Sequence, residues 1–376
     1  MSQHELQQID RELSELLSKR IAVLAKSEPT VFEEQLSKSI PLVTQIGIAK
    51  FLLQNIAAGC TPVLATAHSS LSGVKPRRVT VIGGRGMMGS FFTSRLSVAG
   101  HEVSILDRDD WNHADKLLSR AELVLVCVPI EHTLDAIRKA SQYLNPTTAL
   151  ADITSIKAET VQAMLEHHIG PVVGLHPMFG SGVKSFLSQN VVVCPGREYE
   201  TFQWLLDLIE GEGGKLIICT PEEHDRMMVV VQAIRHFFTF SLGAFLAEEG
   251  IDIERSLEFS SPYYRLQIDM VNRLFAQDAS LSINLMLNTK ERRDAINRLA
   301  NTITRLAHLV TQQDKVALTN EFEAVRSVFK EQIPRSFKET NHVIENLSTF
   351  LVASKSESFP QKICANSTEQ SCTAGK

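Results

Sequence analysis

VTVIGGRGMMG, at residues 79–89, is the stretch of this sequence that decides the fold. Its short β-branched run is typical of a buried parallel strand, and it leads directly into Gly84-x-Gly86-x-x-Gly89 and a helical pattern over residues 91–98. The first glycine permits a tight turn, the second lets the backbone approach a pyrophosphate, and the third lets the helix pack closely on the strand. The helix N-terminus then faces the negative charge. This order of elements predicts a dinucleotide-binding site.

A second strand-like run, residues 102–106, ends at Asp107, about 20 positions beyond the glycines. A carboxylate there binds the hydroxyls of the adenosine ribose and repels a 2′-phosphate, which favours NAD over NADP. Arg108 argues the other way, because a guanidinium can accept a phosphate. The alternative is a strand-helix-strand unit that binds no nucleotide. We predict NAD as the cofactor, and the predicted cofactor-binding residues are Gly84, Gly86, Met88, Gly89, Asp107 and Pro129.

The composition is that of an ordinary soluble protein. Hydrophobic residues make up 44% and charged residues 22% of the 376 residues, and the net charge is −5, which indicates neither nucleic acid nor a membrane as partner. Residues 1–30 show no apolar segment of a secretion signal, and no apolar run reaches the roughly 18 residues of a transmembrane helix. The six cysteines have no metal-ligand spacing. We therefore expect a cytoplasmic protein without a bound metal.

The chain divides into four predicted segments. Residues 1–76 have an irregular helical pattern that ends in a small polar linker. Strands and helices alternate over residues 77–220, which predicts a Rossmann-type, doubly wound parallel sheet of the α/β class. Residues 221–351 predict an all-helical substrate and dimerisation domain, and residues 352–376 a disordered tail. The long helical patterns cover residues 223–248, 256–275, 279–311 and 315–350.

Two polar residues stand where ligands bind in such sheets, at the carboxyl ends of strands. Ser155 ends the strand-like run 149–155, and His176 lies in GLHPMFG at residues 174–180. A neutral imidazole held rigidly there can remove a proton from a hydroxyl while hydride leaves the same carbon, and Ser155 could orient it. The competing interpretation, a histidine that only packs in the core, fits the residues equally well.

Arg265 and Arg273 are eight residues apart, or about two helical turns, so both lie near one helix face. Two guanidinium groups on one face suit a dicarboxylate ligand. The alternative is a solvated face whose arginines pair with carboxylates, and without further evidence it is favoured. His236 lies in the apolar helical segment 232–238, where a core histidine and a ligand-binding histidine fit equally well.

Several separate motifs, in this order along the chain, resemble those of the prephenate dehydrogenase family. The resemblance is to the dehydrogenase half of the bacterial bifunctional chorismate mutase/prephenate dehydrogenases, and it runs from about Arg77 to Phe350. The motifs are VIGGRGMMG at 81–89, GLHPMFG at 174–180, EHD at 223–225, QAIRHF at 232–237, SSPYYRL at 260–266 and RLFAQD at 273–278.

The resemblance implies oxidative decarboxylation of prephenate to 4-hydroxyphenylpyruvate with NAD, in tyrosine biosynthesis. His176 then accepts the proton of the ring hydroxyl, and Ser155 holds the histidine and the hydroxyl in register. Arg273 binds the ring carboxylate that is lost, and His236 lies near the pyruvyl side chain. Supporting roles fall to Arg265, at the substrate, and to Lys157 and His224.

The partners that the resemblance implies are prephenate as substrate, a second copy of the chain in a homodimer, and tyrosine as a feedback inhibitor. Three alternatives stay open. The first is an arogenate dehydrogenase, whose substrate carries an amine in place of the keto group. The second is a bifunctional enzyme with residual chorismate mutase activity, and the third is a non-catalytic regulatory protein that binds tyrosine.

The N-terminal segment departs from the family pattern. Residues 6–24 resemble the opening helix of the chorismate mutase domain, and Arg20 falls on one of its substrate-binding arginines. That mutase stabilises a dianionic transition state with several cations. Here Gln3 and Val31 occupy cationic positions, and Pro29 interrupts the helix. We expect a remnant without useful mutase activity.

Overall fold

The computed structural model describes residues 75–180 and 182–357 and, within the N-terminal segment, Gln8, Arg11, Glu12, Glu15, Leu16 and Lys19. The chain forms two compact units, Met1–Met228 and Val229–Lys376. Of the predicted tail, residues 352–357 belong to a helix, and residues 358–376 lie outside the described residues. So do the residues on which the predicted mutase remnant depends, which are Gln3, Arg20, Pro29 and Val31.

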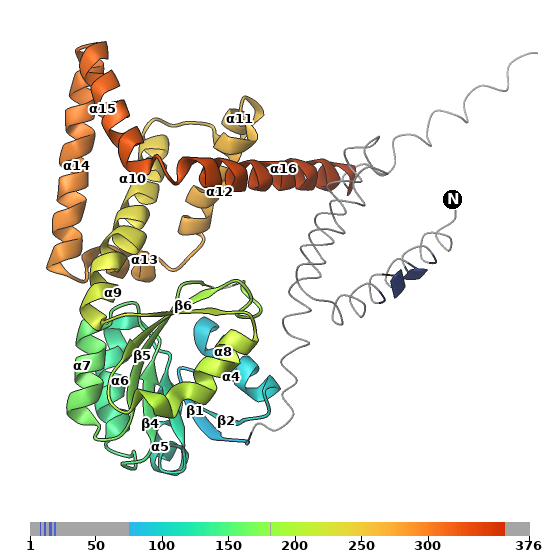
Figure 1. The fold of residues 1–376 in the computed structure, drawn as a ribbon, viewed down its shortest axis with the longest axis vertical. Helices are drawn as coiled ribbons and strands as arrows, with labels where there is room; N and C mark the ends of the chain where they lie inside the picture. The colour runs from blue at the N-terminus through green and yellow to red at the C-terminus, as the bar shows by residue number, and fades with distance from the viewer. Residues whose placement is uncertain are drawn as a thin grey trace, which may run out of the picture. The chain divides into compact units, whose positions relative to one another are not determined.

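A seven-stranded sheet forms the centre of the first unit, with the strand order β2-β1-β3-β4-β5-β6-β7 (Figure 1). The chain leaves β1 for one neighbour, β2, and then crosses to the other, β3, so a topological switch point lies between these strands, where ligands bind in α/β sheets. The strands are β1 (Arg78–Ile82), β2 (Glu102–Leu106), β3 (Leu123–Val126), β4 (Ala149–Asp152), β5 (Val172–Pro177), β6 (Asn190–Pro195) and β7 (Lys215–Ile218).

Strands β1 to β5 are parallel to one another, as predicted, but β6 runs in the opposite direction. β6 runs antiparallel to β5, with Val192 opposite His176, and β7 is parallel to β6. A parallel return needs a crossover connection, which is usually a helix, and the described residues between β5 and β6 form none. The predicted parallel sheet is therefore confirmed as a mostly parallel one, and among the described strands the pairing of β5 with β6 is its single antiparallel pair.

Helices cover both faces of the sheet, which confirms the doubly wound arrangement (Figure 1). The helices of this unit are α4 (Met87–Val98), α5 (Ala114–Leu118), α6 (Ile130–Ser141), α7 (Ala158–His167), α8 (Gln203–Gly211) and α9 (Pro221–Met228), with 3₁₀ turns η2 (Arg108–His113) and η3 (Tyr199–Phe202). Successive strand residues point to opposite faces. Leu123 and Leu125 of β3 therefore pack on the face covered by α4 and α8, and Val124 and Val126 on the face covered by α5, α6 and α7.

Phenylalanine side chains join α4 to the connection between β5 and β6. The ring centroid of Phe91 lies 5.2 Å from that of Phe179 and 5.0 Å from that of Phe186, in edge-to-face contacts. Phe92 makes a similar contact with Phe186, which is fully buried. Such aromatic pairs add to the free energy of apolar burial. The segment that follows His176 is thus anchored on the first helix of the sheet.

The second unit is helical, as predicted, but three of the predicted helical stretches are each split in two. Ser261 accepts the backbone N–H of Tyr264, and Pro262 opens the helix that follows. Thr289 accepts the N–H of Arg292 in the same way, and such caps start new helices. The elements are a π-helical turn η4 (Val229–Ile234), α10 (Arg235–Glu248), α11 (Ile253–Glu258), α12 (Pro262–Phe275), α13 (Ala279–Leu287), α14 (Lys290–Thr311), α15 (Lys315–Phe329) and α16 (Ile333–Glu357).

One helical run, Pro221–Glu248, is long and apolar enough to cross a membrane by length and composition alone. The run is not uninterrupted, because it contains Gln232, Arg235 and His236, and a single helix of this kind is weak evidence for a membrane span. Only 17% of the apolar window is buried, and Phe238 and Phe245 are among its exposed side chains. An exposed apolar surface of this kind is typical of a contact surface.

Candidate active site

The turn from β1 into α4 contains glycines where a Cβ atom would collide. Gly83 adopts a positive φ of 82°, and a Cβ on it would lie 2.5 Å from the carbonyl oxygen of Cys127. A Cβ on Gly84 would lie 2.8 Å from Ile105, and one on Gly89 would lie 2.0 Å from the carbonyl oxygen of Gly83. Gly83 therefore supplies the positive φ of the tight turn, and Gly84 lies in the same turn. Gly89 lets α4 pack closely on the turn.

A cavity of about 580 Å³ opens beside the carboxyl ends of β1, β2 and β3, at the switch point of the sheet. Helix α4 starts here with Gly86 as its N-cap residue, and no side chain caps its first amides, so this N-terminus can receive an anion. The predicted cofactor-binding residues that line the cavity are Gly86, Asp107 and Pro129. Those that do not line it are Gly84, Gly89 and Met88, which packs against the apolar core.

The cavity fits the adenosine part of a dinucleotide. Ile82 and Leu106 give it apolar walls, and the Asp107 carboxylate stands at the end of β2. Oδ2 of Asp107 accepts the backbone N–H of Arg85 at 3.1 Å, and the Arg85 guanidinium lies 3.3 Å from Asp107 and 2.7 Å from Asp110. The hydrogen bond from Arg85 lowers the pKa of Asp110 below its ordinary value. Two carboxylates thus hold Arg85, and Asp107 is placed for ribose hydroxyls.

Ser155 and His176 lie at the carboxyl ends of the adjacent parallel strands β4 and β5. Asp152, the last residue of β4, pairs with Gly174 of β5, and Ser155 follows Asp152 after two further residues. His176 belongs to β5 and is only 5% exposed, while Ser155 is half-buried. The fold therefore brings these two predicted catalytic residues to one edge of the sheet.

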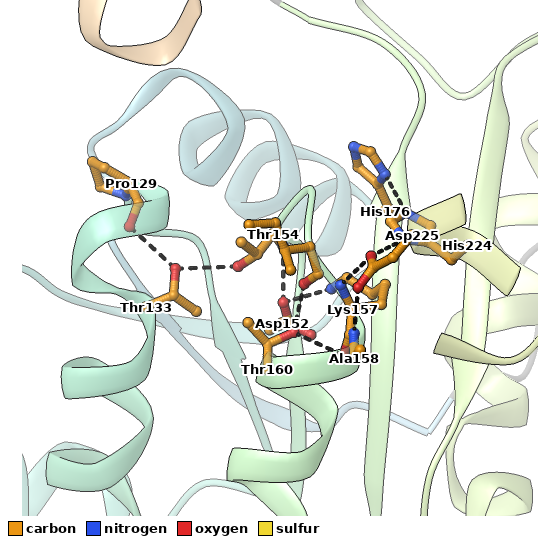
Figure 2. Close-up of polar contacts among 11 residues, drawn as sticks. Pro129, Thr133, Asp152, Thr154, Lys157, Ala158, Thr160, His176, His224 and Asp225 are labelled. Carbon is orange, nitrogen blue, oxygen red and sulfur yellow. Dashed lines mark hydrogen bonds and ion pairs between the residues drawn. The ribbon is translucent and has the colours of Figure 1, made fainter. Parts of the chain in front are cut away.

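A chain of hydrogen bonds runs from His176 to a carboxylate on α9 (Figure 2). Nδ1 of His176 lies 2.7 Å from Nε2 of His224, and Nδ1 of His224 lies 2.8 Å from Oδ1 of Asp225. The sequence assigns His224 only a supporting position, and it assigns Asp225 no role. The signal for this contact is the EHD motif at 223–225, in which an acid directly follows the histidine.

The start of α7 fixes the carboxylate of Asp225. Oδ1 accepts the backbone N–H of Lys157 at 2.8 Å, and Oδ2 accepts that of Ala158 at 2.9 Å (Figure 2). Nζ of Lys157 lies 2.5 Å from Oδ2 of Asp152, and both of these side chains are fully buried. Removing one partner of a buried ion pair leaves an uncompensated charge, which is strongly destabilising. The position of the catalytic residues therefore depends on the buried ion pair between Lys157 and Asp152.

Burial and hydrogen bonds set the charge states in this chain. Burial lowers the pKa of His224 below its ordinary value, and the ammonium of Lys157 acts in the same direction, whereas Asp225 opposes them in part. Burial by itself would raise the pKa of Asp225, but the hydrogen bonds from His224, Lys157 and Ala158 outweigh it and the pKa is lowered. At neutral pH, His224 is therefore neutral and Asp225 is ionised.

Arg265 and Arg273 both lie on α12 of the second unit. Arg265 is half-buried and Arg273 is exposed. Among the residues that the structure describes, neither guanidinium forms an ion pair. The alternative of a face whose arginines pair with carboxylates of the chain has no support within that part of the chain.

His236 lies at the start of α10, directly after the π-helical turn η4, a kind of irregularity that is frequent at functional sites. It is 4% exposed, and its Nδ1 lies 2.8 Å from the carbonyl oxygen of Gln232. A carbonyl oxygen only accepts, so Nδ1 carries the proton and Nε2 the lone pair. Burial lowers the pKa of His236, and Arg235 and Arg292 lower it further. His236 is therefore a neutral histidine at physiological pH.

Two family models match consecutive parts of the chain. Residues 94–218 match the nucleotide-binding domain of prephenate dehydrogenase, and residues 220–324 match its dimerisation domain. The two matches meet between β7 and α9.

Known proteins match over much of the length as well. A T-protein from Haemophilus influenzae is 33% identical over 358 residues, which cover 91% of this chain and 95% of the relative. A T-protein from Enterobacter agglomerans is 38% identical over 270 residues, which cover 72% of each chain. The crystal structure of prephenate dehydrogenase from A. aeolicus, in complex with hydroxyphenyl propionate and NAD+, shares the fold with a TM-score of 0.56 at 19% identity, over 69% of this chain and 99% of that one.

We predict that Gly89→Ala disrupts the dinucleotide turn. Its Cβ would lie 2.0 Å from the carbonyl oxygen of Gly83, so α4 must shift, at a cost of about 1–3 kcal/mol in unfolding free energy. Thermal unfolding with and without NAD should show a lower Tm and a smaller stabilisation by NAD. Gly180→Ala is the matched control, because a Cβ there would have no atom within 4 Å. Equal Tm values and equal NAD effects in the two variants would contradict the role of Gly89.

Proposed function

This chain belongs to the prephenate dehydrogenase family, and we infer from that membership that it catalyses the oxidative decarboxylation of prephenate to 4-hydroxyphenylpyruvate. It is an NAD-dependent oxidoreductase of aromatic amino acid biosynthesis. One observation carries the inference beyond family membership. A cavity that fits a dinucleotide and a buried, hydrogen-bonded histidine, His176, both lie where the parallel strands of one sheet end.

The proposed mechanism assigns the proton transfer to His176. Bound NAD supplies the hydride acceptor. His176 accepts the proton of the ring hydroxyl while the carbon that carries this hydroxyl becomes a carbonyl carbon. Ser155, at the neighbouring strand end, orients the imidazole and the hydroxyl. The ring carboxylate then leaves as carbon dioxide and the ring becomes aromatic, so the protein has mainly to orient the substrate and hold charge.

The second unit supplies the proposed contacts to the substrate carboxylates. Arg273 binds the ring carboxylate, Arg265 supports it from the same helix, and His236 contacts the pyruvyl side chain. What supports this assignment is the state of the two guanidiniums, neither of which forms an ion pair within the described part of the chain. An arginine in that state keeps its donors for a carboxylate ligand.

We propose a division of the chain into domains that follows these roles. Residues 77–220 bind NAD, and residues 221–351 form the substrate and dimerisation domain. Residues 1–76 form the appended segment, and residues 352–376 the tail. The matches to the nucleotide-binding and dimerisation models, at 94–218 and 220–324, support the boundary near residue 220.

The match to a dimerisation domain suggests a homodimer. The whole apolar run Pro221–Glu248 lies within the matched residues 220–324, and the side chains of Phe238 and Phe245 are exposed there. We propose that such side chains pack against a second copy of the chain rather than lipid, because Arg235 and His236 interrupt the run. A cytoplasmic location of the enzyme goes with this proposal.

We predict NADH formation from prephenate by the purified protein, and a loss of roughly 10²-fold or more in kcat for His176→Asn, the scale expected when a general base is removed. Arogenate, which differs from prephenate in carrying an amine, is measured in parallel. Faster turnover of arogenate would change the assigned substrate and keep the mechanism. Absence of turnover with both compounds would place the protein in the binding class.

The N-terminal segment is proposed to have no useful chorismate mutase activity. The match to the H. influenzae T-protein covers 91% of the chain and therefore extends into residues 1–76, yet Gln3 and Val31 stand at the expected cationic positions. We expect chorismate to disappear no faster with the protein than in buffer. An appreciable rate of prephenate formation from chorismate would contradict this.

Tyrosine is proposed as a feedback inhibitor. It keeps the 4-hydroxyphenyl ring of the product and carries a carboxylate on its side chain, so it presents the groups that His176 and His236 are proposed to contact. We expect tyrosine to raise the apparent KM for prephenate without changing kcat. Phenylalanine, which lacks the ring hydroxyl, is the matched control. Equal inhibition by both amino acids, or by neither, would count against this proposal.

A further inference from the structure

The contact between the buried side chains of His176 and His224 determines which nitrogen of His176 carries the proton. We propose that Asp225, acting through His224, holds this proton on Nδ1, so that Nε2 of His176 carries the lone pair that receives the substrate proton. The inference rests on the proposed role of His176 as the base. His224 and Asp225 are positioning residues in this scheme, because they act through His176.

The direction of the hydrogen bonds is set from the carboxylate end. An ionised carboxylate only accepts hydrogen bonds. Asp225 is held by the two amides at the start of α7, at 2.8 Å and 2.9 Å, so both of its oxygens are fixed in place. Its third partner, Nδ1 of His224 at 2.8 Å, must therefore carry a proton and donate it. The position of one carboxylate thus determines the tautomer of His224.

The same reasoning passes from His224 to His176. A neutral imidazole has one donor nitrogen and one acceptor nitrogen. With the proton of His224 on Nδ1, its Nε2 is an acceptor, and the 2.7 Å contact must be donated by Nδ1 of His176. The remaining nitrogen of His176, Nε2, then holds the lone pair. If His224 were protonated on both nitrogens, the contact would reverse and Nε2 of His176 would carry a proton.

The charges around His224 keep it in the neutral state that this scheme requires. The charged groups that act on it are Asp225 on α9, Lys157 at the start of α7 and Asp152 at the end of β4. Burial is the main cause of its lowered pKa. Lys157 is itself paired with Asp152 inside the protein. The geometry of the amides and the buried ion pair thus agree on a neutral His224 beside an ionised Asp225.

The arrangement also bears on the transfer itself. The substrate O–H bond breaks, its proton goes to Nε2 of His176, and its electron pair forms the carbonyl as hydride leaves the carbon. His176 becomes an imidazolium, and the Asp225 carboxylate offsets this charge through His224. A neighbouring anion favours the protonated state of the base. Asp225 therefore contributes to the transition state as well as to the tautomer.

The first test compares His224→Phe with His224→Gln. Phenylalanine fills the space but offers no acceptor to Nδ1 of His176, so kcat should fall by about 10²-fold or more, while KM for prephenate changes little. Glutamine restores an amide oxygen that can accept from Nδ1 and should recover most of the loss. His168→Gln is the control for removing a buried histidine with a backbone partner, since His168 bonds the carbonyl of Thr148 at 2.7 Å. Equal activity of the Phe and Gln variants would overturn the proposal.

The second test observes the tautomer directly. In wild-type protein with ¹⁵N-labelled histidine, long-range ¹H–¹⁵N spectra should show His176 protonated on Nδ1 and unprotonated on Nε2 at neutral pH, with His176→Asn identifying the signals. This measurement needs neither substrate nor cofactor. A proton on Nε2 of His176 would overturn the proposal even if every variant is inactive.

The third test uses the pH dependence of kcat/KM. Asp225→Asn removes the negative charge that favours the imidazolium, so the acid limb should move to lower pH, on the order of half a unit. A role confined to packing would lower activity at all pH values and leave the limb in place, and that result would contradict the proposal. Failure of the proposed function gives a different pattern: His176→Asn would keep its activity. If His176→Asn is inactive and the His224 variants are active, the role of His176 as the base is supported and the proposed role of His224 and Asp225 is contradicted.

Discussion

Two backbone amides donate hydrogen bonds to the carboxylate of Asp225, and the arrangement of the catalytic residues at the edge of the sheet depends on them. These bonds tie the start of α7 to α9, and through His224 the connection reaches β5 and His176. These segments are far apart in the sequence, so their meeting depends on the packing of the whole first unit. A carboxylate in this position is expensive to bury without partners. The amides, together with His224, supply those partners and keep it ionised.

The two ends of the site place charge by different physical means. At the cofactor end, the absence of Cβ atoms at Gly83 and Gly89 lets backbone approach backbone, and the helix dipole of α4 faces the cavity. At the catalytic end, a buried ion pair between Lys157 and Asp152 underlies the histidines. The first device depends on the absence of side chains at two glycines, and the second depends on keeping both charges of the Lys157–Asp152 pair. Such a site tolerates few substitutions at the glycines or at the paired residues.

Much of the fold could be predicted because strand and helix periodicity report burial directly. The glycine turn, the strands and the helical second half all follow from such local patterns. The direction of β6 could not be predicted, since the alternation of a strand is the same in either direction. The contact of His176 with His224 spans 48 residues and depends on how α9 packs, so the motif could identify both residues but not their bond. The helix start at Ser261 was missed, because the predicted helical pattern 256–275 runs through it, although a serine before a proline is a cap signal.

The aromatic contacts between α4 and the segment after β5 have a consequence for how variants of this enzyme are interpreted. Phe91 lies on the helix that faces the cofactor cavity, and it touches both Phe179 and Phe186 beyond His176. A cavity made by truncating any of these rings is felt by its neighbours, since protein interiors are close-packed. A lesion in this apolar cluster therefore disturbs the cofactor helix and the histidine strand together. Variants there will appear as defects of catalysis, although the altered side chain does not line the cofactor cavity.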